Sequence, residues 1–196
     1  MMGGCAMKVR DSGMPDEEMW ASFFDPEHIL SSFGISDNVS DLIEFGCGYG
    51  TFSLTASRLV SGTVHALDIE PGLIRLVRSR CAEAGLNNVK ARVCDFVGLG
   101  SGVPDNSADA ALLFNILHHD QPVALMAEAW RVLVPGGILA IIHWNHDPTT
   151  PRGPSLDIRP RPEQIVDWGG LAGFDINAIH RFDFPPYHYG LKFTKS

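Results

Sequence analysis

The sequence predicts an α/β domain in which helices cover both faces of a mainly parallel sheet. Short apolar runs of strand length alternate with longer segments of helical periodicity along most of the chain. A cluster of glycines at 46–50 directly follows the first such run, as in many ligand-binding turns. With 45% hydrophobic and 19% charged residues among 196, the chain has the composition of a folded domain.

The first half of the chain contains six predicted elements after its N-terminus. We expect residues 1–14 to be a flexible N-terminus and residues 15–196 to form a single domain. An acidic start followed by aromatic residues at helical spacing predicts a helix within 15–30. The next elements are a strand at 41–45, a helix at 51–60, a strand at 63–67, a helix from Pro71 to a stop at Gly85, and a strand at 89–93.

The second half continues the alternation after a loop at 98–107. A strand at 109–114 precedes a helix that Asp120 and Pro122 open, and the Pro-Gly-Gly at 135–137 separates this helix from a strand at 138–143. Residues 144–162 contain five prolines and predict a long loop of the length typical of a functional lid. A helix at 164–171 and strands at 174–179 and 190–194 complete the expected order.

Composition excludes several functional classes. A formal net charge of −8 argues against a general affinity for nucleic acid, which needs many Lys and Arg side chains. No apolar run approaches the roughly 20 residues of a membrane-spanning helix, and the first residues lack the apolar segment of a secretory signal. The four cysteines show no paired spacing. We therefore expect a cytoplasmic protein without nucleic-acid or membrane partners.

The glycine cluster carries the most specific information. In the string EFGCGYGT, glycine occupies 46, 48 and 50, whereas a dinucleotide fingerprint needs glycine at 46, 48 and 51. Glu44 precedes the turn and places a carboxylate where a pyrophosphate would be repelled. A ligand with an ammonium group and no phosphate fits this turn better.

Three further strands end in polar residues. Asp68 ends the second strand, 20 positions after Gly48, where a carboxylate can accept hydrogen bonds from both hydroxyls of a ribose. Asp95 and Phe96 follow the third strand and offer a carboxylate and a ring to an adenine. Asn115 follows the fourth strand. Because parallel strands end at one edge of a sheet, we expect these side chains to form one rim.

These motifs resemble those of the class I S-adenosylmethionine-dependent methyltransferases. The likeness covers residues 40–145 and is greatest to the small-molecule group related to ubiquinone-biosynthesis and arsenite methyltransferases. It rests on the ordered strings LIEFGCGYGTFS, VHALDIEPGLI, VCDF, LLFNILHH and RVLVPGGILAI. The resemblance implies a Rossmann-like, doubly wound sheet of seven mostly parallel strands with an antiparallel last strand.

The resemblance also implies a cofactor, S-adenosyl-L-methionine, and roles for ten residues. Those expected to contact its methionine part are Glu44, Gly46, Cys47 and Gly48. Asp68 would bind the ribose hydroxyls, Ile69 the adenine face, and Asp95 with Phe96 the adenine edge. Asn115 and Ile116 would close the site under the sulfonium.

The acceptor side is less defined by the sequence. If the acceptor must lose a proton, the candidate bases are His118, His119, Asp120, His143 and His146. We favour His143 as the catalytic residue because it ends the fifth strand, where it is expected to face the cleft. By position, an acceptor pocket is expected from Trp144, Tyr187 and His188.

Simpler interpretations remain open for several of these residues. Asp68 and Asp95 are also suited to capping helices, and Asn115 to stabilising a loop. The aromatic cluster is either core packing or a lid over the cofactor, and comprises Met19, Trp20, Phe23 and Phe24. The arginines of the proline-rich loop are either a solvated face or a site for an anionic acceptor, and are Arg152, Arg159 and Arg161. The histidine pairs lack supporting ligands, so we expect no metal.

The sequence thus predicts an S-adenosylmethionine-dependent methyltransferase with an unidentified, small-molecule acceptor and an undefined oligomeric state. One alternative is a non-catalytic S-adenosylmethionine-binding partner protein, which would need the same cofactor residues. The other is an NAD-dependent oxidoreductase, which Glu44 and the missing fingerprint glycine disfavour.

Overall fold

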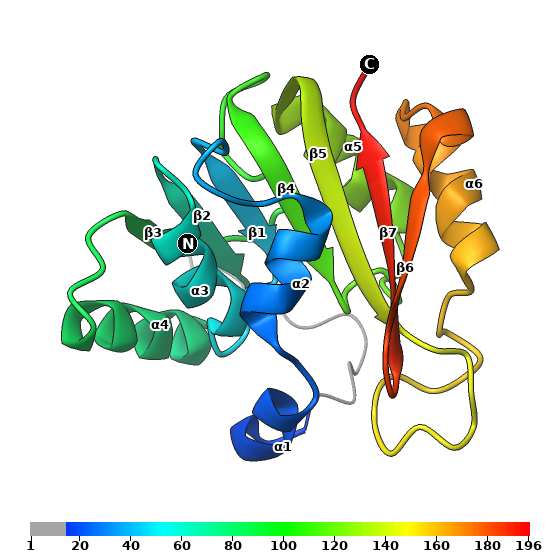
Figure 1. Ribbon diagram of the computed structural model, residues 1–196, viewed down its shortest axis with the longest axis horizontal. Helices are drawn as coiled ribbons and strands as arrows, with labels where there is room; N and C mark the ends of the chain where they lie inside the picture. The colour runs from blue at the N-terminus through cyan, green and yellow to red at the C-terminus, as the bar shows by residue number, and fades with distance from the viewer. Residues whose placement is uncertain (1–14) are drawn as a thin grey trace, which may run out of the picture.

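A computed structural model describes residues 15–196, so the expectation for residues 1–14 lies outside the described residues. Seven strands form one sheet in the order β3-β2-β1-β4-β5-β7-β6 (Figure 1). They are β1 (Leu42–Phe45), β2 (Val64–Asp68), β3 (Val89–Val93), β4 (Ala108–Phe114), β5 (Leu133–Trp144), β6 (His180–Phe184) and β7 (His188–Thr194). Strands β1 to β5 pair in parallel, and β7 runs antiparallel to both β5 and β6. The predicted sheet, with its antiparallel last strand, is confirmed.

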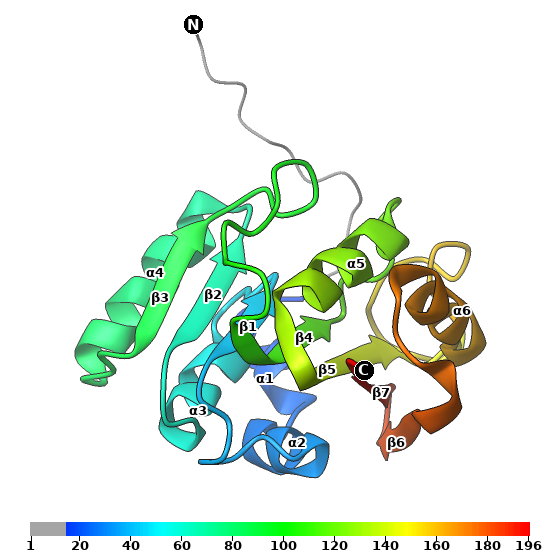
Figure 2. The same ribbon diagram turned by 90° about the horizontal axis from the view of Figure 1, so that it is seen from above.

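Helices cover both faces of this sheet. They are α1 (Glu17–Ser22), α2 (Pro26–Phe33), α3 (Thr51–Leu59), α4 (Pro71–Glu83), α5 (Pro122–Val132) and α6 (Pro162–Ala172), with a 3-10 helix, η1, at Ile176–Ala178. Seen from above, α2 and α3 lie on one side of the sheet and α5 and α6 on the other (Figure 2). This layering is the predicted arrangement for alternating strands and helices.

The core consists of two main apolar layers, one on each face. In β4, Ala110, Leu112 and Phe114 pack with α2 and α3. The alternate residues Ala111 and Leu113 face the opposite layer, with α5 and α6. Because side chains alternate along a strand, a parallel strand buried on both faces reads as a continuous apolar run. This explains why DAALLF was recognisable as a strand.

The single N-terminal helix expected within 15–30 is wrong, because the segment forms two helices. Asp16 caps α1 by accepting a hydrogen bond from the backbone N–H of Met19 at 3.0 Å. Asp25 caps α2 in the same way, accepting from His28 at 3.1 Å, and Pro26 occupies the first turn. A proline has no N–H to continue α1, so it starts a new helix instead.

The strand expected at 174–179 is also wrong. This segment contains η1, whose N-cap Asp175 accepts a hydrogen bond from the N–H of Asn177 at 2.9 Å. The strand β6 lies at 180–184, in a segment expected to be a connection. There Phe182 and Phe184 pack against Phe33 of α2, with ring centroids 4.9 and 5.6 Å away. Tertiary packing, which the local pattern does not encode, therefore decides the position of this strand.

The strand order creates a switch point beside β1. The chain builds β1, β2 and β3 outward to one edge and then crosses back to place β4 on the other side of β1. In open α/β sheets, ligands bind beyond the carboxyl ends of the strands at such a point. Within residues 15–196, no helix has the length and apolar character needed to cross a membrane.

Candidate functional site

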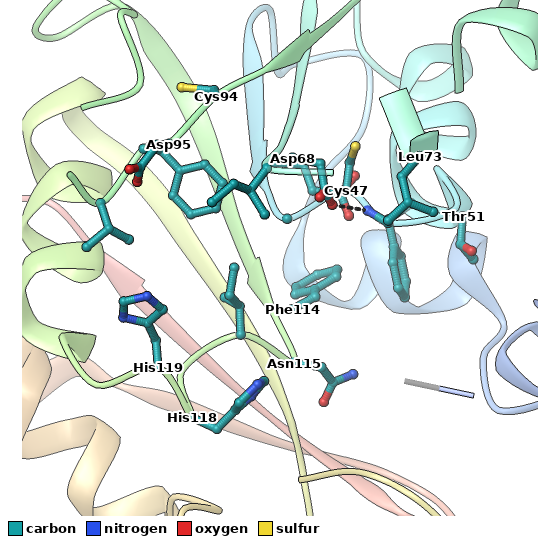
Figure 3. A pocket seen from close by; sticks show the side chains of 18 of the residues that line it. Cys47, Thr51, Asp68, Leu73, Cys94, Asp95, Phe114, Asn115, His118 and His119 are labelled. Carbon is teal, nitrogen blue, oxygen red and sulfur yellow. Dashed lines mark hydrogen bonds between the residues drawn. The ribbon is translucent and has the colours of Figure 1, made fainter. Parts of the chain in front are cut away.

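A cavity of about 350 Å³ opens at the carboxyl ends of the strands beside the switch point. All ten residues predicted to bind the cofactor line it, namely Glu44, Gly46, Cys47, Gly48, Asp68, Ile69, Asp95, Phe96, Asn115 and Ile116. Figure 3 shows Asp68 and Cys47 at one end of this cavity and Asn115, His118 and His119 at the other. The residues that were expected to form one rim therefore line one cavity.

The glycine turn between β1 and α3 requires its glycines. Gly46, Gly48 and Gly50 have φ values of 77°, 52° and 83°, in the left-handed region that side chains disfavour. A Cβ atom on Gly46 would lie 2.7 Å from Cδ1 of Ile116, and one on Gly50 would lie 2.6 Å from Cδ1 of Leu54. The turn therefore brings the backbone against the cavity wall without side chains in between.

Asp68 holds this turn in place. Its Oδ2 accepts a hydrogen bond from the N–H of Gly48 at 2.9 Å, and its Oδ1 accepts one from Glu70 at 2.9 Å (Figure 3). The N-cap residue of α4 is Glu70, so Asp68 is not the helix cap that the simpler interpretation proposed. Its carboxylate lies at the cavity and also fixes the geometry of the turn that faces the ligand.

Asp95 does not cap a helix, because β4 is the next element after β3. Its Oδ1 accepts a hydrogen bond from the N–H of Gly98 at 2.9 Å, which stabilises the turn after β3. The carboxylate also lines the cavity beside Phe96, whose ring packs against Phe45 with centroids 5.3 Å apart. A buried core contact thus fixes the ring at this end of the cavity.

Glu44, in β1, is a buried acid that lines the cavity. Its side chain is 2% exposed, and its Oε2 accepts a hydrogen bond from the Ser53 hydroxyl. Burial, with a smaller contribution from the nearby Asp68 carboxylate, raises the pKa of Glu44 to about 8, although the hydrogen bond from Ser53 opposes this. A cation beside Glu44 would reverse the shift, because it stabilises the carboxylate.

Asn115 has an unusual backbone and an unsatisfied side chain. Its φ of 54° is uncommon for a residue with a Cβ, and its N–H donates to the carbonyl oxygen of Ile142 at 2.8 Å. Both polar atoms of its amide are buried, and neither has a hydrogen-bond partner within residues 15–196. Buried amides normally have partners, so these two atoms are suited to bind a ligand in the cavity. The interpretation of Asn115 as a residue that only stabilises a loop finds no side-chain bond to support it.

The expectation that His143 faces the cleft is wrong. His143 lies at the end of β5, but it is completely buried and does not line the cavity. The ring of His118, which does line it, lies 5.8 Å from the His143 ring between centroids. Burial lowers the pKa of His143 well below its ordinary value, with His118 and His188 adding to the effect, so its imidazole is neutral and weakly basic.

The other candidate bases divide into two groups. His119 lines the cavity, and its Nδ1 lies 2.8 Å from Oδ1 of Asp120 and 3.0 Å from the N–H of Gln121. His146 lies outside the cavity, with its Nε2 3.0 Å from the carbonyl oxygen of Leu156. Among residues 15–196, no cluster of three His, Cys, Asp or Glu side chains is placed to hold a metal ion.

Two tryptophans from distant segments complete the cavity. Trp20 of α1 and Trp144 of β5 both line it. Behind them, Phe23 packs on Trp144 with centroids 5.3 Å apart, and Phe24 packs on His188 at 4.6 Å. Trp20 of this aromatic cluster thus lines the cavity, and Phe23 and Phe24, which follow α1, make packing contacts, so the lid interpretation stays a prediction.

The predicted acceptor pocket is only partly correct. Trp144 lines the cavity, whereas Tyr187 and His188 do not. His188 instead packs against the Trp144 indole, with centroids 4.2 Å apart. Sequence reasoning did not identify as cavity residues Thr51, Phe52, Leu73, Cys94, Val97, Gly98, Phe114 and Gln121. Cys94, Val97 and Phe114 directly neighbour predicted cofactor residues in the chain, which is the signal that would have found these three.

The arginines of the long loop do not reach the cavity. Arg159 is 6% exposed, and its guanidinium donates hydrogen bonds to the carbonyl oxygens of Pro154, Asn145, Asp147 and Arg152. It also donates to the hydroxyl of Thr150. Arg159 therefore organises the loop between β5 and α6, and the expected site for an anionic acceptor at these arginines is not part of the cavity.

Comparison with known proteins identifies the family that residues of this chain match. Residues 42–137 match the methyltransferase domain family. Aklanonic acid methyltransferase DauC from Streptomyces sp. (strain C5) is 30% identical over 102 residues, which are 50% of this chain and 46% of that protein. The chain therefore aligns with about half the length of this curated relative.

Two solved structures have a similar fold. A SAM-dependent methyltransferase from Aquifex aeolicus superposes with a TM-score of 0.80 and 23% identity, covering 92% of this chain and 95% of that one. The [4+2]-cyclase SpnF superposes with a TM-score of 0.72 and 18% identity, covering 95% and 84%.

The fold, the glycine turn and the family match together define the class. Residues 42–137 belong to the class I S-adenosylmethionine-dependent methyltransferase family. The narrower relation to ubiquinone-biosynthesis and arsenite methyltransferases stays a prediction.

Proposed function

We propose that the protein is an enzyme that transfers a methyl group from S-adenosyl-L-methionine to a small-molecule acceptor. The observation that carries this proposal is that all ten predicted cofactor residues, from four different strand ends, line one cavity. We further propose a cytoplasmic location, which the free thiols of Cys47, Cys81 and Cys94 support.

The residues at the cofactor end fit this cofactor. Glu44 offers a buried carboxylate to an ammonium group, and the turn at Gly46 and Gly48 lets the backbone approach closely. Asp68 offers a carboxylate to ribose hydroxyls, and Asp95 lies beside the Phe96 ring at the adenine position. The set contains three carboxylates and no Lys or Arg, which suits a cationic nucleoside and opposes a pyrophosphate.

Catalysis in this proposal depends on positioning. The cofactor supplies an electrophilic methyl group, and the acceptor attacks it in line. The protein has to hold the two together and exclude water, which accounts for much of the acceleration in such reactions. Asn115 and Ile116 line the cavity and would position the reacting groups. If a base is needed, His118 and His119 are better placed than His143, because both line the cavity.

Two alternatives are addressed by the same site. An NAD-dependent oxidoreductase is disfavoured because Thr51 stands at the third fingerprint position and Glu44 would repel a pyrophosphate. A non-catalytic S-adenosylmethionine-binding partner would have the same cofactor end, so it is distinguished only by methyl transfer. The cyclase with a similar fold illustrates that this fold alone does not fix the reaction.

The decisive test is calorimetric titration of the protein with S-adenosylhomocysteine, with NAD as the parallel control. We expect micromolar binding of S-adenosylhomocysteine and none of NAD. Absence of S-adenosylhomocysteine binding, or binding of NAD, would contradict the proposal. Binding followed by transfer of a labelled methyl group to an acceptor would separate the enzyme from the non-catalytic partner.

A further inference from the structure

A second group of cavity residues, called the acceptor end below, differs in chemistry from the carboxylates and glycines of the cofactor end. These residues come from α1, from the segment between β4 and α5, and from the end of β5. They are Trp20, Asn115, His118, His119, Gln121 and Trp144. No lysine or arginine occurs among the residues that line the cavity.

Arg159 lies close to Trp144 but does not line the cavity. The Arg159 guanidinium lies 6.0 Å from the centre of the Trp144 ring, but it is buried and donates hydrogen bonds to four backbone carbonyls. Gly153 of the same loop packs against Trp144, since a Cβ there would lie 2.8 Å from Cδ2 of the indole. The loop therefore separates Arg159 from the cavity. Among residues 15–196, no lysine or arginine lines the cavity to pair with an anionic acceptor, and desolvating an unpaired charge is costly.

Trp20 and Asn115 offer complementary contacts to an uncharged acceptor. Trp20 is half-buried and lines the cavity, and its ring is held at 4.8 Å from that of Phe24. The Asn115 amide provides a donor and an acceptor, both buried and without partners within the described residues. A flat ring with one polar substituent can stack on the indole and bond to the amide at the same time.

From these contacts we propose that the acceptor is an uncharged, flat, aromatic or conjugated molecule, which stacks on Trp20 and presents its hydroxyl group to Asn115. This inference rests on the proposed methyltransferase function and narrows it to a substrate class. It separates this chain from its relative, which is named for an acid.

The test compares two probes that share a ring and differ in charge. The protein is first titrated with S-adenosylhomocysteine and then, in its presence, with 2-naphthol or 2-naphthoate by calorimetry. We expect 2-naphthol to bind at least about tenfold more tightly. Equal affinities, tighter binding of 2-naphthoate, or binding of neither would overturn the inference. Failure of the first titration would instead overturn the proposed function, so the two failures are distinguishable.

Substitutions at Trp20 and Gln121 test where the two probes bind. Trp20→Ala should weaken 2-naphthol binding at least about fivefold, and Trp20→Phe should retain most of it. Gln121→Arg places a cation at the mouth and should tighten 2-naphthoate binding without improving 2-naphthol binding. Asn87→Arg introduces the same charge at an exposed site outside the cavity and is the matched control. Equal effects of the two arginine variants, or none of Trp20→Ala, would refute the assignment.

Discussion

The two ends of the cavity are built in different ways. The cofactor end uses short polar residues at the ends of β1, β2 and β3, fixed by backbone hydrogen bonds such as that from Gly48 to Asp68. The acceptor end uses large aromatic side chains from α1 and β5, fixed by packing against Phe23, Phe24 and His188. The first end lies within residues 42–137 that match the family, whereas Trp20 and Trp144 lie outside them. The proposed cofactor thus meets residues whose positions are set locally by the glycine turn and the strand ends. The proposed acceptor meets residues that are placed by packing between distant segments.

Removal of the Asp68 carboxylate should give the largest effect, and only at the cofactor end. Asp68→Ala removes the proposed ribose contact and leaves the N–H groups of Gly48 and Glu70 without their acceptor. We expect S-adenosylhomocysteine affinity to fall by about 1 to 3 kcal/mol, measured by calorimetry. Asp167→Ala, at an exposed site in α6, is the control. Unchanged affinity in a folded variant would contradict the assigned role.

A fall in pH should destabilise the protein through His188, which packs at the acceptor end. Burial lowers the pKa of His188 to about 3 in the folded protein, so below about pH 6.5 only the unfolded chain takes up this proton. Stability is therefore lost as the pH falls, by about 2 kcal/mol at pH 5 for this residue. Urea unfolding should show that His188→Phe reduces the loss between pH 7 and pH 5.

The exposed His28 supplies the control for this comparison, as His28→Phe should leave the pH dependence unchanged. Equal pH dependence in wild type and His188→Phe would show that the aromatic end does not bury a neutral histidine.

A rise in pH should destabilise the ligand-free protein through Glu44 at the cofactor end. Because the folded pKa of Glu44 is raised to about 8, the ligand-free protein loses stability from this group as the pH rises above about 4.5 and through 8. Binding of an ammonium group needs the carboxylate, so S-adenosylhomocysteine affinity should rise about eightfold between pH 7 and pH 8.5. Calorimetry at both pH values measures this. Glu44→Gln should bind weakly and without this rise, and a similar rise in the variant would remove Glu44 as its cause.

The smallest effect is expected where α1 meets the cofactor turn. Arg80 Nη1 lies 2.5 Å from Glu17 Oε1, in an ion pair that is 28% and 43% exposed. Partly exposed pairs contribute less than about 1 kcal/mol, so Glu17→Gln should leave global stability nearly unchanged. We expect faster proteolysis within α1 and a modest loss of 2-naphthol affinity. Glu18→Gln, at the exposed next residue, should behave like wild type, and identical proteolysis of both variants would exclude the proposed contribution.

The sequence was a better guide to the cofactor end than to the acceptor end for a physical reason. Glycines with positive φ and acids at strand ends are local requirements, so Gly46, Gly48 and Asp68 could be predicted from their order in the chain. The His143 ring packs beside the rings of His118 and Tyr189, which come from other segments of the chain, and the local pattern does not encode these contacts. The displacement of the sixth strand to 180–184 has the same origin, because Phe182 and Phe184 pack on α2.

Arg80 has a consequence for how the two ends communicate. Its guanidinium contacts Glu17 of α1 and also donates a hydrogen bond to the carbonyl oxygen of Tyr49 at 2.9 Å, inside the glycine turn. The Tyr49 hydroxyl in turn donates to the carbonyl oxygen of Pro15 at 3.1 Å, just before α1. Two contacts thus join the helix that carries Trp20 to the loop that would bind the methionine part of the proposed cofactor. A shift of that loop would therefore also shift Trp20, so the two sets of cavity residues share one mechanical support.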